Sequence, residues 1–129
     1  TGPIDEFFGY KFGRLDYRCV NIDFQTFDID SFQPASVVNY PNDYDFTRIT
    51  EFKKFMPNKT SKTTIGIEYP GKDGFPAWPV FDNKNQAIFQ MYWLEAENLK
   101  KENIYFVGRL AEYKYYDMDD VVKRALEVF

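Results

Sequence analysis

The chain carries few of the side chains that usually perform covalent chemistry. Among its 129 residues there is no histidine and a single cysteine, Cys19. A metal site of the zinc type, a Ser-His-Asp triad and a Cys-His pair are therefore excluded. Residues 71–74 lack the spacing of a phosphate-binding loop. Chemistry must come from carboxylates, arginines and tyrosines, which gather at residues 108–119 (GRLAEYKYYDMD), or from a bound cofactor.

The composition indicates a globular protein rich in aromatic rings. Aromatic residues make up 20% of the chain, more than one small core requires, so some rings are expected to line a pocket or an interface. The net charge of -4, with no basic run, argues against nucleic acid as a partner. The lone cysteine and the lack of a long apolar run lead us to expect a soluble, cytoplasmic protein with no membrane partner.

Alternating apolar and polar residues predict a mainly antiparallel sheet. The expected strands cover residues 18–24, 36–40, 46–55 and 63–69. A polar link at residues 57–62 would join the last two strands in a hairpin.

The last third of the chain has helical periodicity. We expect a helix near residues 83–100, a short buried strand near residues 103–107 and a C-terminal helix near residues 118–128. The whole chain, residues 1–129, would then form a single α+β domain. The apolar face of the first helix would consist of Ala87, Ile88, Met91 and Leu94.

Residues 108–119 would connect the short strand to the last helix, which Asp117 or Asp119 could cap. Ligands in such units bind beside helix N-termini, because unpaired backbone N–H groups point there. The loop is therefore expected to face a ligand. The alternative is an ordinary connection with surface tyrosines, and spacing alone does not decide between the two.

Five different short motifs are distributed along nearly the whole chain. They are TGPID at residues 1–5, VVNY at 37–40, TRITE at 47–51, EYP at 68–70 and the stretch GRLAEYKYYDMD at 108–119. Together, and in this order, they are specific. The chain resembles the C-terminal portion of the UDP-galactopyranose mutases.

The resemblance implies part of an isomerase that interconverts UDP-galactopyranose and UDP-galactofuranose with reduced FAD, through an adduct between flavin N5 and the sugar. Residues 18–82 would form the substrate sheet, and residues 83–129 the strand, loop and helix beside FAD. UDP-galactose would be the substrate of a full-length parent protein. The family's Gly-rich dinucleotide fingerprint is missing here, so the chain alone would bind FAD weakly or not at all and would be inactive.

The resemblance assigns substrate contacts to Arg48, Tyr115 and Trp78. Arg48 matches an arginine that contacts the substrate diphosphate, a role suited to a permanently charged fork. Its alternative role is a salt bridge on the strand face. Tyr115 matches a tyrosine that hydrogen-bonds the same diphosphate. Trp78 stands where the family commonly has a tyrosine, and would stack or donate through its indole N–H.

Cofactor contacts are implied for four residues. Arg109 and Asp117 match residues beside the flavin, where Arg109 would favour negative charge on the reduced ring. Met118 would present its backbone N–H, and Gly2 lies in the stretch that leads out of the flavin domain. The implied catalytic residues are Arg48, Arg109, Tyr115 and Asp117.

Two other hypotheses remain open at this stage. The chain could be a non-catalytic nucleotide-sugar or partner-binding module derived from the mutase fold, or an α+β domain whose aromatic patch is an interface. Exposed aromatic residues also lead us to expect self-association into a homo-oligomer.

Overall fold

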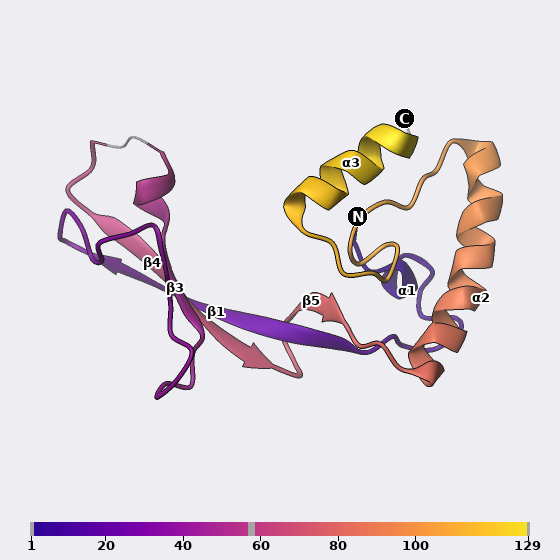
Figure 1. The fold of residues 1–129 in the computed structure, drawn as a ribbon, viewed down its shortest axis with the longest axis horizontal. Coiled ribbons are helices and arrows are strands. Elements are labelled where there is room, and N and C mark those ends of the chain that lie inside the picture. The colour runs from indigo at the N-terminus through magenta and orange to yellow at the C-terminus, as the bar shows by residue number, and fades with distance from the viewer. Residues whose placement is uncertain (1, 57–58, 129) are drawn as a thin grey trace. The chain divides into compact units, whose positions relative to one another are not determined.

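The computed structural model describes residues 2–56 and 59–128 (Figure 1). They form five strands and three α-helices, which confirms the predicted α+β class. Thr1, Phe129 and part of the predicted link at residues 57–62, namely Pro57 and Asn58, lie outside the described residues. The chain divides into two compact units: unit 1 is Thr1–Arg18 with Pro76–Phe129, and unit 2 is Cys19–Phe75. Each unit is described by itself.

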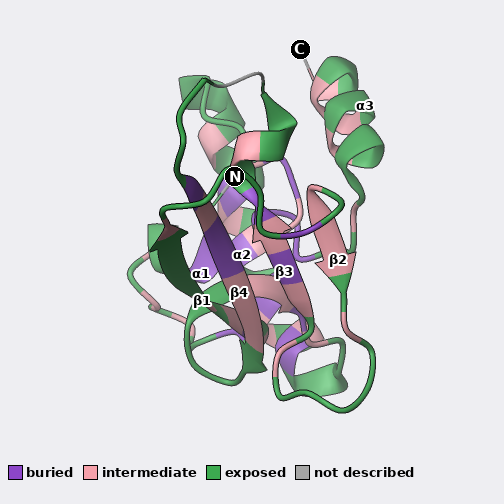
Figure 2. Ribbon diagram, turned by 90° about the vertical axis from the view of Figure 1, so that its left-hand side faces the viewer, coloured by how far each residue is buried: buried purple, intermediate pink, exposed green. Residues whose placement is uncertain are grey.

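Unit 2 is built on antiparallel strands in the order β2-β3-β4-β1. The predicted strands are confirmed as β1 (Tyr17–Phe27), β2 (Val37–Asn39), β3 (Arg48–Glu51) and β4 (Thr63–Gly71). β3 and β4 pair in the predicted antiparallel sense, with Ile49 opposite Ile67. Figure 2 colours the buried parts of the ribbon purple. Ile49 on β3 and Ile65 on β4 are buried and form the apolar centre of this unit.

The predicted strand at residues 46–55 is too long. β3 ends at Glu51, and Phe52–Phe55 form a 3₁₀ turn, η1. The cause is packing: a Cβ placed on Gly66 would lie 3.1 Å from the Phe52 ring and 3.0 Å from Ile22. The missing side chain of Gly66 thus leaves room for the ring to fold over β4, which turns the backbone out of the strand direction.

Unit 1 is organised around α2 (Asn83–Leu99), which confirms the predicted helix near residues 83–100 and is followed by the 3₁₀ turn η2 (Lys100–Glu102). Asp82 caps α2, its Oδ1 accepting the backbone N–H of Asn85 at 2.7 Å. The short strand β5 (Phe75–Pro79) precedes the helix and was not indicated by the sequence pattern. Prolines cannot donate a hydrogen bond to a neighbouring strand, so a segment that contains two of them does not look like a strand in the sequence.

The predicted apolar face of α2 is wrong in part. Met91 and Leu94 are exposed, at 41% and 67%, whereas the buried residues of α2 are Asn85, Phe89, Tyr92 and Ala96. Aromatic stacking selects this face, because the Phe89 ring packs against Tyr113 at 5.6 Å and the Tyr92 ring against Phe8 at 5.8 Å.

The N-terminal segment completes the core of unit 1. α1 (Ile4–Phe7) buries Ile4 and Asp5, and the Asp5 carboxylate accepts the Leu15 backbone N–H at 3.0 Å and the Tyr17 hydroxyl at 3.2 Å. The Tyr92 hydroxyl accepts the Phe12 N–H and donates to the Gly13 carbonyl. The turns after α1 are therefore tied to α2 by buried hydrogen bonds.

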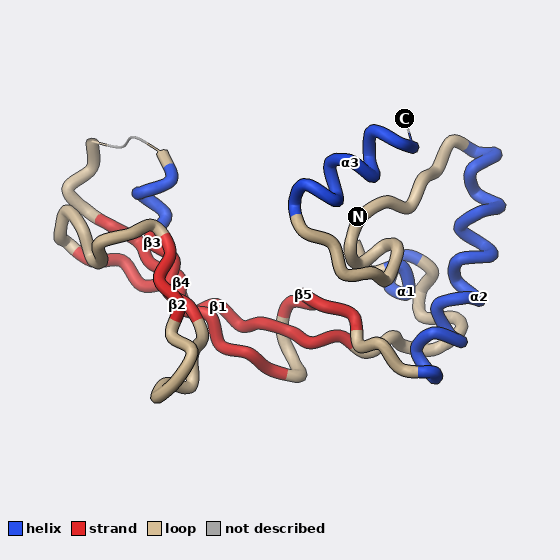
Figure 3. The backbone as a smooth tube through the Cα atoms, viewed as in Figure 1, coloured by secondary structure: helices blue, strands red, loops and turns tan. Residues whose placement is uncertain are grey.

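The predicted buried strand at residues 103–107 is wrong. These residues form a loop, drawn in tan between α2 and α3 in Figure 3. Asn103 has a left-handed backbone, and Ile104 donates its N–H back to Leu99 O at 3.2 Å, which ends the helix rather than starting a ladder. Within the described part of the chain no strand pairs with this segment. Only Val107 is buried, and Tyr105 is 37% exposed.

The C-terminal helix is confirmed as α3 (Met118–Val128). Asp117 precedes it, and the Asp117 N–H donates to Asp120 Oδ2 at 3.2 Å while its carbonyl accepts from Val121. The carboxylate of the third helical residue thus reaches back to the capping position. None of the described α3 residues is buried.

Candidate functional site

Arg109 lies in the loop between η2 and α3, where its guanidinium is held from two sides. Nε donates to the Tyr116 carbonyl at 3.0 Å, and Nη2 contacts the same oxygen. Nη1 donates to the Ala77 carbonyl of β5 at 3.3 Å. A guanidinium has five N–H groups, so this cation is fixed in place and keeps further donors for a ligand.

Tyr115 lies against this fixed cation. The Arg109 guanidinium carbon is 5.2 Å from the centre of the Tyr115 ring, a cation–π contact. Tyr115 is 59% exposed, so its hydroxyl can meet a ligand. The loop therefore presents a permanent positive charge and a phenolic hydroxyl together.

Tyr113, two residues earlier, has the opposite environment. It is buried, and its hydroxyl lies 2.7 Å from the Asp16 carbonyl and 2.9 Å from the Val80 carbonyl. Burial is the main reason that the pKa of Tyr113 rises to about 12. Its backbone φ of 47° lies in the left-handed region. Tyr113 therefore anchors the loop inside unit 1, whereas Tyr115 is exposed.

Asp117 and Met118 stand at the start of α3, where both are exposed and Met118 is 87% exposed. The first turn of a helix carries unpaired N–H groups and partial positive charge. Asp119 and Asp120 balance part of that charge. Within unit 1, Arg109, Tyr115 and Asp117 thus belong to one continuous loop that ends at a helix N-terminus.

Trp78 and Gly2 are the other predicted contacts in unit 1. Trp78 is half-buried on β5, next in sequence to Ala77, whose carbonyl holds Arg109. Gly2 is exposed and lines a hollow of about 310 Å³ with Phe7, Tyr105 and Phe106 among its walls. Nothing in the described contacts connects Gly2 with Arg109.

Arg48 lies in unit 2, on β3. Its Nη2 donates to Glu68 Oε2 at 2.7 Å across the β3–β4 ladder, where the two residues are direct partners. The predicted alternative, a salt bridge on the strand face, is therefore present. The Arg48 side chain keeps 38% exposure, so the ion pair orients the guanidinium without enclosing it.

Two residues of unit 1 that the sequence pattern did not indicate, Glu112 in the loop and Arg124 on α3, form an ion pair. Glu112 is 2% exposed, and its Oε1 accepts Nε of Arg124 at 2.8 Å. The only signal in the sequence is an acid and a base twelve positions apart. That spacing is meaningless until the loop folds back on α3.

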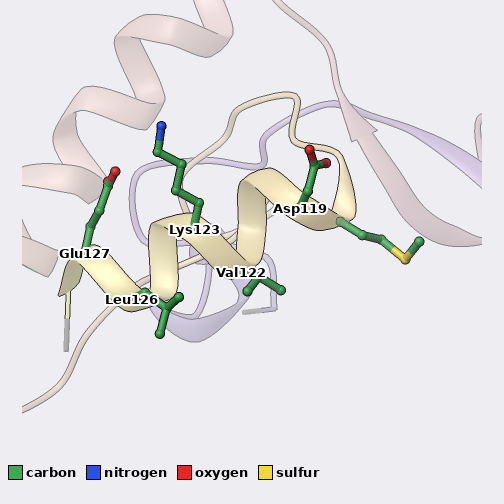
Figure 4. A pocket seen from close by; sticks show the side chains of 6 residues that line it. Asp119, Val122, Lys123, Leu126 and Glu127 are labelled. Atoms are coloured by element: carbon green, nitrogen blue, oxygen red, sulfur yellow. The ribbon is translucent and has the colours of Figure 1, made fainter.

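A second hollow, of about 600 Å³, runs along α3. Figure 4 shows Val122 and Leu126 on the same side of the helix, with Lys123 and Glu127 projecting elsewhere. Val122 is 60% exposed and Leu126 is 78% exposed. This apolar stripe has the spacing of a helix face that packs against another surface.

The residues of the loop suit a flavin ring that gains negative charge on reduction. A fixed cation at Arg109 and the N-terminus of α3 both favour negative charge. The chemistry of this donor set therefore fits the implied cofactor.

The chain matches the family model described as UDP-galactopyranose mutase over residues 1–115. This chain belongs to the UDP-galactopyranose mutase family. It is 37% identical to a probable UDP-galactopyranose mutase of Klebsiella pneumoniae, over 98% of this chain and 34% of that protein. It is 33% identical to the UDP-galactopyranose mutase of Mycoplasma genitalium, over 94% of this chain and 32% of the relative.

A relative in Escherichia coli bears a different name. The dTDP-fucopyranose mutase of that organism is 36% identical, over 98% of this chain and 34% of the relative. The chain thus spans about a third of the length of the curated relatives it matches. The family resemblance is confirmed, and the named relatives are sugar-nucleotide mutases.

Residues 2–56 and 59–128 lack the features of two other classes of site, a membrane-spanning helix and a metal centre. None of the helices there combines the length and apolar character needed to cross a lipid bilayer. Nor do acidic residues and Cys19 in that part of the chain gather into a group of three that could hold a metal ion.

Proposed function

We propose that this chain supplies part of the active site of a flavin-dependent isomerase that interconverts UDP-galactopyranose and UDP-galactofuranose. The observation that carries the proposal is the loop of residues 108–117, in which Arg109 and Tyr115 are in contact at the entrance to α3. Membership of the mutase family supports the reaction. The activity belongs to the whole protein that contains this chain.

Arg109, Asp117 and Met118 would hold the cofactor side of the site. Arg109 is already fixed by two carbonyl groups, so it would stabilise negative charge on the cofactor without reorganising. The backbone N–H of Met118, in the first turn of α3, would add a donor of the same polarity. Reduced flavin, when bound, supplies the nucleophilic nitrogen that this chain lacks.

The substrate diphosphate would be bound by Arg48 and Tyr115. The Glu68 carboxylate keeps the Arg48 fork oriented and leaves part of it exposed for phosphate oxygens. The exposed hydroxyl of Tyr115 would donate one hydrogen bond. Trp78 would contribute its indole N–H or a stacking face where relatives use a tyrosine.

The test is turnover by the whole protein. Supplied with dithionite-reduced FAD and UDP-galactofuranose, it should form UDP-galactopyranose, measured by separating the two nucleotide sugars chromatographically. Oxidised FAD serves as the control and should give no product. Bound reduced flavin without any product would refute the proposed reaction.

The relative named dTDP-fucopyranose mutase motivates a second arm with dTDP-fucopyranose as substrate. Turnover of that sugar alone would keep the reaction class and change the substrate. A non-catalytic module is the remaining candidate, and it predicts nucleotide-sugar binding by calorimetry with no turnover of either sugar.

This chain by itself should bind FAD weakly or not at all. The loop of residues 108–117 offers charge complementarity to the ring, but the sequence holds no Gly-rich fingerprint for the pyrophosphate. Titration of the isolated chain with FAD, followed by flavin fluorescence, should therefore show affinity far below that of the whole protein.

A further inference from the structure

Glu112 is a buried carboxylate in the middle of the proposed cofactor loop. At 2% exposure it is as buried as a core residue, a place where a charged group lies only when it is paired. Both of its oxygens are used. Oε2 accepts the Gly108 backbone N–H at 3.1 Å, and Oε1 accepts Arg124 Nε at 2.8 Å.

The hydrogen bonds of Glu112 close the loop on itself. The Glu112 backbone N–H donates to the Gly108 carbonyl at 2.8 Å, so Gly108 and Glu112 are bonded through both main chain and side chain. Arg109, between them, donates to the Tyr116 carbonyl at the far end of the loop. Burial raises the pKa of the Tyr116 hydroxyl, and the neighbouring Glu112 charge raises it further.

Arg124 ties this closed loop to the last helix. It lies on α3, two turns after Met118, and is the helix residue that reaches the buried carboxylate. Its Nη1 is also 3.6 Å from Glu127. None of the described α3 residues is fully buried, and the bond from Arg124 to the buried Glu112 carboxylate links the helix to the loop.

We propose that Glu112 and Arg124 are positioning residues: the ion pair between the buried Glu112 carboxylate and the partly exposed Arg124 holds the 108–117 loop and the first turn of α3 in the arrangement that presents Arg109 and Asp117 to the cofactor. This inference rests on the proposed function of the loop. The Glu112 carboxylate is buried and is therefore not available to contact a ligand. It acts through the loop backbone, because Glu112 fixes Gly108 on one side of Arg109 and α3 on the other.

The main test compares Arg124→Met with Lys123→Met in the whole, flavin-loaded protein. Both variants remove one positive charge from α3, but Lys123 is exposed and lies in a different direction from the apolar stripe (Figure 4). Arg124→Met should shift the flavin reduction potential and lower kcat by about tenfold, with KM for the nucleotide sugar within about threefold of wild type. Lys123→Met should leave all three unchanged.

Two further variants separate positioning from a general loss of structure. Arg124→Lys keeps a charge within reach of Glu112 and should recover part of kcat. Glu112→Gln alone should act in the same direction as Arg124→Met, and it serves if Arg124→Met does not fold.

Hydrogen exchange separates failure of this inference from failure of the proposed function. The Gly108 amide should exchange about tenfold faster in Arg124→Met than in Lys123→Met, whether or not the protein is a mutase. The variant could show faster Gly108 exchange while the wild-type protein neither binds flavin nor turns over substrate. That result would overturn the proposed function but support the role of the Glu112–Arg124 pair in holding the loop. A folded Arg124→Met that matches Lys123→Met in exchange, reduction potential and kcat would overturn this inference.

Discussion

Arg48 and Arg109 use the same guanidinium in different ways. Arg48 pairs with a carboxylate, Glu68, so the charges cancel locally and the fork is oriented. Arg109 is bound by neutral carbonyls of Tyr116 and Ala77, so its full positive charge is available. The first arrangement suits a diphosphate that binds and leaves. The second suits a charge that must persist beside a cofactor.

Replacing Arg48 should therefore affect the substrate alone. In the whole protein, Arg48→Ala should weaken UDP binding by about 10- to 100-fold, the loss expected for one charge-assisted contact of about 1.5–3 kcal/mol. Flavin occupancy should stay near wild type. Calorimetry with UDP and the flavin absorbance spectrum measure the two quantities.

Arg48→Lys is the matched control, since it keeps the charge and loses the fork. It should bind UDP with intermediate affinity. Unchanged UDP affinity in Arg48→Ala would remove Arg48 from the proposed site.

The environment of Glu51 should make the stability of the protein depend on pH. Its carboxylate is fully buried and accepts the N–H groups of Phe32 and Gln33 and the Thr63 hydroxyl. Burial alone would raise the pKa of Glu51, but the hydrogen bonds from Phe32, Thr63 and Gln33 outweigh it, so the pKa lies below the ordinary value of 4.5.

Because the folded-state pKa is the lower one, the stabilising contribution of Glu51 is complete above about pH 4.5 and is lost as the pH falls through the folded value. Urea unfolding should show this loss. Glu51→Gln should destabilise by about 2 kcal/mol or more at neutral pH and flatten the acid dependence. Glu102→Gln, at an exposed position, is the control. If the stability of Glu51→Gln falls with acid as steeply as that of the wild-type protein, Glu51 is not the source of the acid dependence.

At the scale of elements, α2 illustrates how a local signal can define a helix but not its buried face. The Asp82 cap locates the start of α2, and the helical period indicates its length. Both signals are local, because they depend on residues close to each other in the sequence. The buried face depends on rings from distant segments, Phe8 and Tyr113. Exposed Met91 and Leu94 look like core residues only when those rings are unknown.

Removal of the α2 cap should have a modest and specific cost. Asp82 Oδ1 accepts the Asn85 N–H at 2.7 Å, and Oδ2 accepts the Asn85 side-chain amide at 3.0 Å. Asp82→Ala should lower the unfolding free energy by about 1–2 kcal/mol, measured by urea denaturation. Asp82→Asn should restore most of this loss, since asparagine also caps helices well; no difference between alanine and asparagine would rule out the cap.

At the scale of the whole molecule, the apolar stripe of α3 is a prominent exposed hydrophobic surface. Met118, Val122 and Leu126 are all more than half exposed on one amphipathic helix. Exposed apolar stripes of this kind favour association. The chain spans about a third of the length of its curated relatives.

The isolated chain is expected to self-associate through this stripe. Leu126→Gln should lower the sedimentation coefficient observed at high protein concentration, because it removes apolar surface while glutamine still favours the helix. Lys123→Gln, on the polar side of α3, should leave association unchanged. A wild-type chain that sediments as a monomer at every concentration would show that the stripe does not drive association.

The sequence by itself determined the strands of unit 2 except for the end of β3, the extents of α2 and α3, the α+β class and the family. These features are encoded locally, by alternation, helical period, capping residues and motifs in order. The tertiary structure decided features that need partners distant in the sequence. It turned residues 103–107 into a loop because no described strand pairs with them. It also gave Arg109 its carbonyl tethers and brought Arg124 to the buried Glu112, contacts that no local pattern specifies.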